Sequence, residues 1–337
     1  MRRARQGNWM WIGIVLAMSV TTLAETAPLR SHRLEGKLYV TVADVAGYYH
    51  LGRGVRHDDR GVEYRTAASS LAVEADSREI QLDNVKHWLS APVLSARDQF
   101  WMTPLDVLKT IDPILRRGRT EGRSATETVV IDPGHGGADE GTHGANSREK
   151  DMTLDLAKRV KRDLAGVPGL HVLLTRTADV TTPLEDRVEF SRSEHADLYV
   201  SLHFNSGGTA DGIETYCVPP AGAPITAHAP YEGETEATGA NAAVTNNRFD
   251  EQNVWLAHCV QKCLLQATHA NDRGVRRARF YVLRNAVCPA ILVEAGFLSN
   301  RSEEAKILTS EYRDVLAKAI AWGIETYTGK SPGKGQP

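Results

Sequence analysis

The sequence has little net charge and no internal repeat, and these absences exclude several classes of protein. It contains 40 lysine and arginine residues against 42 aspartate and glutamate residues, a formal net charge of −2. Such a chain has no overall attraction for nucleic acid or for an anionic membrane. Hydrophobic residues make up 42% of the chain and charged residues 24%, as in ordinary globular proteins. The function must therefore be read from local groups of side chains.

Long apolar stretches are also absent, apart from a short one at the amino terminus. Three arginines among the first five residues precede an apolar core at residues 9–20, and residues 22–24 end in a small alanine. A core of about a dozen residues is too short to cross a bilayer comfortably. We therefore predict a signal peptide over residues 1–24, hence an exported protein, with an uncleaved membrane anchor as the alternative.

Cysteine is scarce, and its spacing argues against a cysteine zinc site. The four cysteines are Cys217, Cys259, Cys263 and Cys288, and no Cys-x-x-Cys pair occurs. Cys263 lies on an apolar helical stripe that Cys259 borders, so we expect buried thiols that pack as small hydrophobic groups. Export also permits disulfides, but a chain of this length can build a core without them.

Residues 33–115 are predicted to form a small β-rich domain. Strands are expected at residues 38–42, 71–75, 85–92 and 99–103, followed by a helix at 105–111. Residues 116–125 are polar and contain glycine, which is typical of a linker.

From residue 126 to residue 328, predicted strands alternate with predicted helices. Strands are expected at residues 129–131, 171–174, 198–202, 213–217, 280–283 and 290–293, and helices at 149–164, from 183, at 251–268 and at 312–327. This alternation predicts an α/β fold with a largely parallel sheet. Residues 218–250 form an insert without periodicity, too long for an ordinary loop, and residues 329–337 are predicted to be a disordered tail.

Polar residues follow three of the predicted strands. His135 comes shortly after the strand at 129–131, His203 directly follows the strand at 198–202, and Glu294 directly follows the strand at 290–293. The carboxyl ends of parallel strands share one edge of a sheet, where ligands bind, so we expect these side chains to converge. Glu149 begins the helix that follows the first loop, which allows it to return to the same edge.

Two imidazoles and a carboxylate are the ligand set of a catalytic zinc that keeps a position open for water. Here these ligands would be His135, Glu149 and His203, with Glu294 as general base or acid. Taken singly, His203 fits an ordinary core histidine, and Glu149 fits a helix N-terminus, where its charge suits the dipole. Glu294 is harder to explain, since a carboxylate among buried residues is costly unless it is paired or functional. The joint arrangement therefore predicts a zinc hydrolase site.

The motifs around these residues resemble those of a known family. The matching segments are residues 130–137, 149–151, 175–176, 187, 201–205, 273–275, 282–284 and 289–300, together with Asp139, Gly141 and Gly144. With them, residues 126–328 resemble the N-acetylmuramoyl-L-alanine amidase family often called Amidase_3. The resemblance implies a three-layer α/β/α fold, with Zn²⁺ held by His135, Glu149 and His203 and with Glu294 as the catalytic glutamate.

The resemblance also implies a substrate. The substrate would be peptidoglycan, cut at the amide between the lactyl group of N-acetylmuramic acid and L-alanine of the stem peptide. The predicted export would place the protein in the periplasm or cell wall; a protein activator is a candidate partner, and the sequence does not decide whether one is needed. A zinc peptidase acting within the stem peptide and a non-catalytic wall-binding protein are the alternatives. Residues 33–115 resemble, more weakly, a β-rich stalk domain of exported bacterial proteins, which implies wall targeting or a spacer; a packing domain without a ligand is the alternative.

Two segments depart from the family's pattern. Residues 191–195 replace the small stretch with alanine and asparagine that is expected before Ala196, and the insert at 218–250 matches no familiar version. The insert contains His228 and three glutamates at 232, 234 and 236 that can reach the rim of the site. We expect it to line the substrate groove, with self-inhibition as the alternative. His143 is expected to be solvated rather than a ligand.

Overall fold

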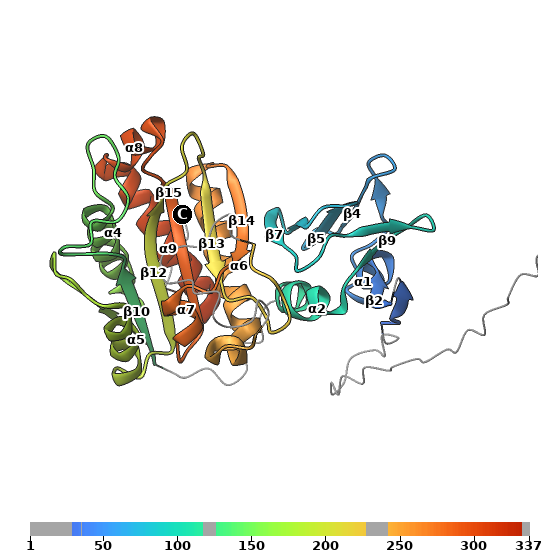
Figure 1. The fold of residues 1–337 in the computed structure, drawn as a ribbon, viewed down its shortest axis with the longest axis horizontal. Coiled ribbons are helices and arrows are strands. Elements are labelled where there is room, and N and C mark those ends of the chain that lie inside the picture. The colour runs from blue at the N-terminus through green and yellow to red at the C-terminus, as the bar shows by residue number, and fades with distance from the viewer. Residues whose placement is uncertain (1–28, 35, 117–125, 227–241, 332–337) are drawn as a thin grey trace, which may run out of the picture.

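The computed structural model describes residues 29–34, 36–116, 126–226 and 242–331. The expected signal peptide, most of the expected linker and the last six residues lie outside these ranges, as do His228 and the three glutamates of the insert. Within the described ranges, no helix combines the length and the apolar character needed to cross a bilayer. A large sheet with helices on both faces lies beside a smaller β-rich part (Figure 1). We call the smaller part, residues 29–116, the N-terminal module.

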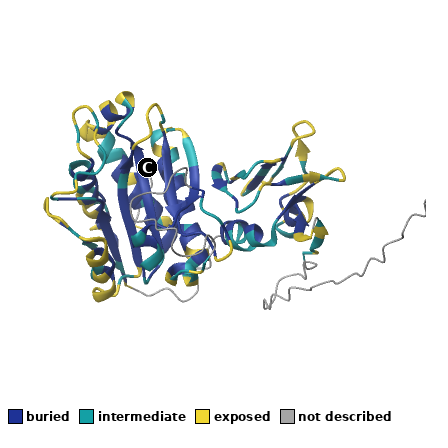
Figure 2. Cartoon of the chain, in the orientation of Figure 1, coloured by how far each residue is buried: buried dark blue, intermediate teal, exposed yellow. Residues whose placement is uncertain are grey.

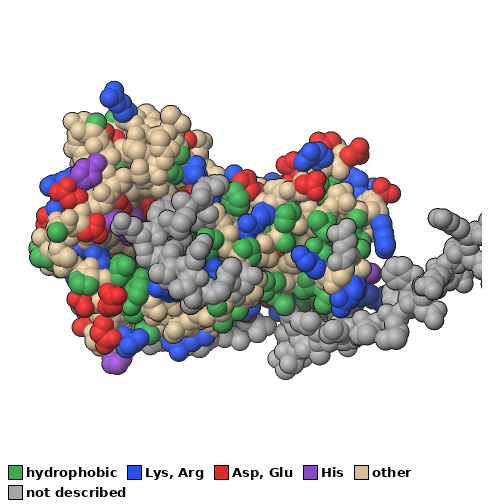
Figure 3. All heavy atoms as spheres, viewed as in Figure 1, with side chains coloured by type: hydrophobic (Ala, Val, Ile, Leu, Met, Phe, Trp, Pro, Cys, Tyr) green, Lys and Arg blue, Asp and Glu red, His purple; other side chains and the backbone are tan. Residues whose placement is uncertain are grey.

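The N-terminal module consists of short strands joined by turns, with helices at its beginning and end. Its elements are β1 His32–Leu34, β2 Lys37–Thr41, α1 Val42–Tyr48, β3 Val55–Arg56, β4 Gly61–Arg65, β5 Ser70–Glu74, β6 Glu79–Leu82, β7 Val85–Trp88, β8 Leu94–Ala96, β9 Gln99–Met102, α2 Pro104–Asp106, the π-helical turn η1 Val107–Ile111 and α3 Asp112–Leu115. Four strands form an antiparallel sheet in the order β1-β2-β9-β8, and β3 to β7 form an antiparallel meander. Acidic and basic side chains intermix on the exposed end of the module (Figure 3).

The C-terminal domain, residues 126–331, alternates strands and helices as predicted. Its elements are β10 Glu127–Pro133, α4 Glu149–Leu164, β11 Leu170–Leu174, α5 Leu184–Ser193, β12 Leu198–Asn205, β13 Ile213–Cys217, the 3₁₀ turn η2 Thr245–Phe249, α6 Asp250–Thr268, β14 Asp272–Arg277, α7 Tyr281–Asn285, β15 Ala290–Phe297, α8 Arg301–Ile307 and α9 Ser310–Thr328. The sheet order is β11-β10-β12-β15-β13-β14. The first four strands are parallel, and β13 runs antiparallel to β15.

Both faces of this sheet are covered, which explains why its strands are apolar almost throughout. Val129 and Ile131 belong to one core, on the face of α4, α6 and α9. Val130 and Tyr199 belong to a second core, on the face of α5 and α7. The central strands are dark blue in Figure 2, between helices with exposed outer surfaces. The three-layer α/β/α fold with a largely parallel sheet, preceded by a β-rich part, is therefore confirmed.

Two local predictions are wrong. Residues 280–283, expected to form a strand, lead into the helix α7, where Val282 and Leu283 are buried in the second core. A short apolar run has no periodicity that separates a strand from a buried helical turn. The strand β15 also extends to Phe297 and β12 to Asn205, so Glu294 and His203 lie within their strands rather than after them. The four cysteines are buried thiols outside any disulfide, as predicted.

The N-terminal module is joined to the C-terminal domain through the sheet itself. The strand β7 pairs in parallel with β14, with His87 opposite Val275, so that one sheet of eleven strands runs through both parts. The approach is close at Gly274, where a Cβ atom would lie 2.9 Å from the backbone oxygen of Lys86. Only glycine fits there without displacing β7.

Candidate metal centre

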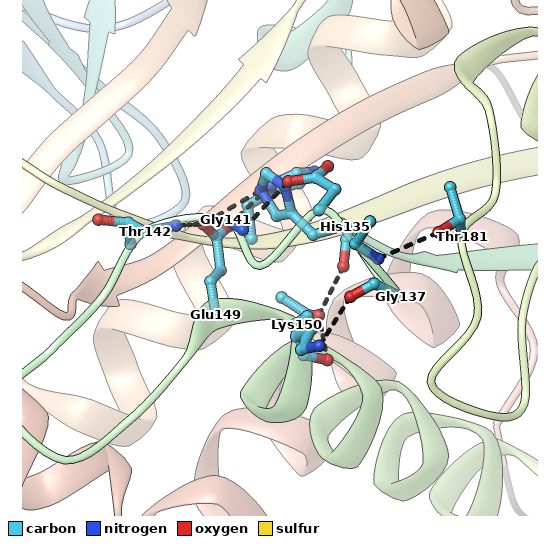
Figure 4. A network of polar contacts seen from close by, with 12 residues as sticks. His135, Gly137, Gly141, Thr142, Glu149, Lys150 and Thr181 are labelled. Carbon is cyan, nitrogen blue, oxygen red and sulfur yellow. Dashed lines mark hydrogen bonds and ion pairs between the residues drawn. The ribbon is translucent and has the colours of Figure 1, made fainter.

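Three side chains that lie far apart in the sequence converge beside the sheet. His135 comes from the loop after β10, Glu149 is the first residue of α4, and His203 lies in β12. The Nε2 atom of His135 is 3.1 Å from Oε2 of Glu149, and Nδ1 of His203 is 2.9 Å from Oε1 of the same carboxylate. One nitrogen of each histidine and one oxygen of Glu149 lie within 4.8 Å of one another (Figure 4). This group is able to hold a metal ion.

The backbone around His135 makes this convergence sterically possible. His135 has a φ of +60°, in the left-handed region that few non-glycine residues adopt. At Gly134, a Cβ atom would lie 2.3 Å from Cε1 of His203. At Gly141, it would lie 2.5 Å from Oε2 of Glu149. The loop therefore needs glycine at these two positions, because the side chains of the site pack directly against its backbone.

Buried arginines hold the loop in this shape. Arg187 of α5 donates from Nη1 to Oδ1 of Asp132 at 2.6 Å and from Nη2 to the backbone oxygen of His135 at 2.7 Å. Arg176 donates from Nη2 to the backbone oxygen of Gly134 at 2.8 Å. Beside the site, Lys150 donates to the backbone oxygen of Gly137 at 2.8 Å (Figure 4). Hydrogen bonds of charged donors are among the strong ones, so the loop is firmly anchored.

A second layer of contacts orients the side chains of the site. Asp139 lies 2.8 Å from Nδ1 of His135, which leaves Nε2 as the atom that faces the cluster. Backbone amides of Thr142 and Phe204 donate to the two oxygens of Glu149, at 2.8 and 3.1 Å. Such outer contacts are typical of metal sites, where they fix the orientation of each ligand.

The electrostatics of the cluster favour an ionised Glu149. Burial alone would raise the pKa of Glu149, but hydrogen bonds and charge from His135 and His203 more than offset it and lower that pKa. Burial lowers the pKa of His135, whereas Glu149 and Asp139 raise it, and the net direction is upward. A carboxylate that stays charged while 3% exposed is suited to a cation.

Glu294 lies beside the cluster, opposite His203 in the pairing of β12 with β15. The residue is 5% exposed, and Oε2 has no hydrogen-bond partner among the described residues. Burial raises the pKa of Glu294 well above its ordinary value, and the charges of Glu149 and Glu214 add to this effect. An unpartnered buried carboxyl is costly, which is typical of a functional group.

A cavity of about 600 Å³ opens over these residues. The residues that line it include His135, Glu149, His203 and Glu294, together with Leu184 of α5 and Tyr281 of α7. The cavity therefore combines polar groups with apolar contact surface.

Other candidates behave differently. His143 is exposed and lies 3.2 Å from Glu140 rather than in the cluster. No role was predicted from the sequence for Asp132, Arg187 or Lys150, although all three are buried. A charged residue that directly follows a buried apolar run, as Asp132 follows residues 129–131, was the sequence signal that could have revealed one of them.

Known proteins match the C-terminal domain. The profile of the N-acetylmuramoyl-L-alanine amidase family matches residues 129–326. An uncharacterized cell wall amidase of Bacillus anthracis is 35% identical over 60% of this chain and 35% of its own length. The N-acetylmuramoyl-L-alanine amidase AmiA of Escherichia coli is 33% identical over 59% of this chain and 75% of its own length. The catalytic domain of CwlV, an N-acetylmuramoyl-L-alanine amidase from Bacillus (Paenibacillus) polymyxa, superposes with a TM-score of 0.50 at 32% identity, covering 60% of this chain and 99% of that domain.

Proposed function

Because the chain belongs to the N-acetylmuramoyl-L-alanine amidase family, whose activity is hydrolysis of the bond between N-acetylmuramic acid and L-alanine in peptidoglycan, we propose that it cuts this bond with zinc held by His135, Glu149 and His203. The observation that carries the proposal is the convergence of these three side chains in one cavity with Glu294, whose Oε2 has no hydrogen-bond partner among the described residues.

The residues fit zinc on the chemistry of their donors. Two imidazole nitrogens and one carboxylate oxygen are the protein ligands of many catalytic zinc sites, which keep a further position for water or substrate. Bound zinc supplies a Lewis acid that polarises the amide carbonyl and makes water a better nucleophile. The contact of Asp139 with Nδ1 of His135 keeps that imidazole turned toward the cluster.

In this proposal Glu294 moves the proton that hydrolysis requires. Its carboxylate takes a proton from the attacking water and delivers it to the amine nitrogen of L-alanine as the amide bond breaks. Burial and two nearby carboxylates raise its pKa, and strongly perturbed pKa values are typical of groups that take part in proton transfer.

The proposal extends to location and partners. The amino-terminal sequence has the pattern of a signal peptide, so we propose export to the periplasm or cell wall, where peptidoglycan lies. A protein activator is a further expected partner. The division of the chain into an N-terminal module, a linker and a catalytic domain remains a prediction. Wall targeting by the N-terminal module is part of the same proposal.

Mass spectrometry of peptidoglycan digested with the purified full-length chain tests the proposed bond. Free stem peptides that begin with L-alanine are expected, and the glycan strands should stay polymerised. New reducing ends would identify a glycosidase. Shortened peptides still joined to muramic acid would identify a peptidase, and an undigested wall would favour a binding protein.

A further inference from the structure

A second buried carboxylate lies next to Glu294. Glu214 of β13 is directly opposite Glu294 in the antiparallel pairing of β13 with β15, and it is 2% exposed. Residues directly opposite in such a pair have Cβ atoms about 5 Å apart on the same face of the sheet. Two carboxylates held this close away from water need a compensating positive charge. That charge comes from outside the metal cluster.

Four side chains occupy the oxygens of Glu214. Arg273 and Arg276 contact Oε2, with their Nε atoms at 2.9 and 3.2 Å. Asn205 and the hydroxyl of Tyr216 donate to Oε1, each at 2.7 Å. Asn205 also lines the cavity of the site. Glu214 therefore ties two arginines to a cavity residue and to the strand position beside Glu294.

Both arginines lie on β14, the strand on which the N-terminal module docks. The guanidinium of Arg276 lies over the ring of Trp88, with Cζ 4.2 Å from the ring centroid. The indole Nε1 of Trp88 donates to the backbone oxygen of Arg273 at 3.1 Å. The backbone amide of Lys86, two residues before Trp88, donates to Oδ2 of Asp272 at 2.6 Å. Trp88 thus contacts both arginines that hold Glu214.

We propose that Trp88 is a positioning residue of the active site, acting through Arg273 and Arg276 on Glu214 and so on Glu294. Trp88 lies outside residues 129–326, the part that matches the family, so this chain uses its N-terminal module to support its catalytic glutamate. The inference rests on the proposed function, because it assigns Glu294 the proton transfer.

Loss of the Trp88 ring should act first on Arg276. The ring under the guanidinium limits the rotamers of Arg276, as a cation–π contact does, together with hydrogen bonds from Nη1 to the backbone oxygen of Thr226 at 2.9 Å and from Nε to that of Arg273 at 3.2 Å. Without the ring, Arg276 is held less firmly within 3.2 Å of Glu214, and so is the Glu214 carboxylate next to Glu294. Small displacements of a reacting group lower the rate of chemistry more than they weaken substrate binding. The loss should therefore fall on kcat.

The test compares full-length variants on soluble peptidoglycan fragments. W88L should lower kcat about fivefold, the size expected for one partly desolvated cation–π contact, with KM and zinc content unchanged. W88F keeps the ring over Arg276 and should recover most of the activity. The matched control is K109M, which removes another contact between the two parts, the 3.5 Å ion pair of Lys109 with Asp250, and should leave kcat unchanged.

A double-mutant cycle separates positioning from general destabilisation. If Trp88 acts through Glu214, the W88L/E214Q double variant should be no slower than E214Q alone. Multiplied losses in kcat, or a kcat of W88L equal to that of K109M, would overturn the proposal. If the wild-type chain releases no stem peptide, the proposed function is wrong. The same cycle measured by urea unfolding then decides the coupling: a non-additive result supports a link between Trp88 and Glu214, and an additive result refutes it.

Discussion

His203 lies directly opposite Glu294 across the parallel strands β12 and β15. Because the register of a sheet fixes which residues are neighbours, this pairing places a proposed metal ligand and the proposed base at the same level of the sheet. The carboxylate of Glu149 reaches the same point from the start of α4, 2.9 Å from His203. The site is thus built on strands and a helix end, with only His135 supplied by a loop.

Removal of a proposed ligand should remove the metal. The purified chain should carry about one zinc, the number that one site with three protein ligands implies. H135A should lose it, because the remaining two ligands hold zinc weakly. Elemental analysis of dialysed protein measures the content. H143A is the control, since His143 contacts Glu140 outside the cluster, and equal zinc in both variants would rule out the assignment of His135.

Packing against Gly134 should matter for the same site. A Cβ atom added there would lie 2.3 Å from Cε1 of His203, so G134A must displace that imidazole. We expect weaker zinc affinity by about 10- to 100-fold, the range seen when ligand orientation is disturbed. Competition with a chelator measures this affinity. G166A is the matched control, because a Cβ atom at Gly166 meets nothing within 4 Å, and an unchanged affinity in G134A would contradict the geometry.

The buried ion pair of Asp132 with Arg187 should contribute strongly to stability. The carboxylate is 1% exposed and also accepts from Ser201 Oγ at 2.8 Å. D132N leaves Arg187 buried without its countercharge, which costs about 3–5 kcal/mol. Urea unfolding should show this loss, and a loss below about 1 kcal/mol, within the range of exposed ion pairs, would contradict it.

Acid should act on the same pair. Burial raises the pKa of Asp132, but Arg187 and hydrogen bonds more than offset it, so the pKa is lowered in the folded protein. Stability from such a group is fully present above the unfolded aspartate pKa of about 3.9. It is lost as the pH falls below that value toward the folded pKa. Wild-type stability should therefore fall more steeply than that of D132N below about pH 4, and parallel curves would show that Asp132 titrates normally.

Much of the site could be predicted from local patterns. In the sequence, His135, His203 and Glu294 each follow an apolar run that is predicted to be a strand. The carboxyl ends of parallel strands lie at one edge of a sheet, so this pattern predicts that the three side chains meet. Glu149 could be placed at the same edge because the apolar periodicity of residues 149–164 indicates where its helix begins. The supporting residues were missed, because Asp132 and Arg187 are 55 positions apart and nothing local links them.

The contact between the two parts could not be predicted at all. The strand β14 lacks an alternating apolar pattern, since Arg273, Arg276 and Arg277 lie in it. These arginines are accommodated by partners that the folded chain brings to them, among them Glu214, Trp88 and Cys217. Strand formation here is decided by tertiary partners rather than by intrinsic preference.

Zinc content and stem-peptide release, measured on the same samples of wild type, H203A and E294Q, test the central claim most directly. The wild type should hold about one zinc and release peptides that begin with L-alanine. H203A should lose both properties. E294Q should keep its zinc and lose about 10²- to 10⁴-fold in rate, the contribution of a general base. Full activity of E294Q, or an active H203A without zinc, would contradict the account.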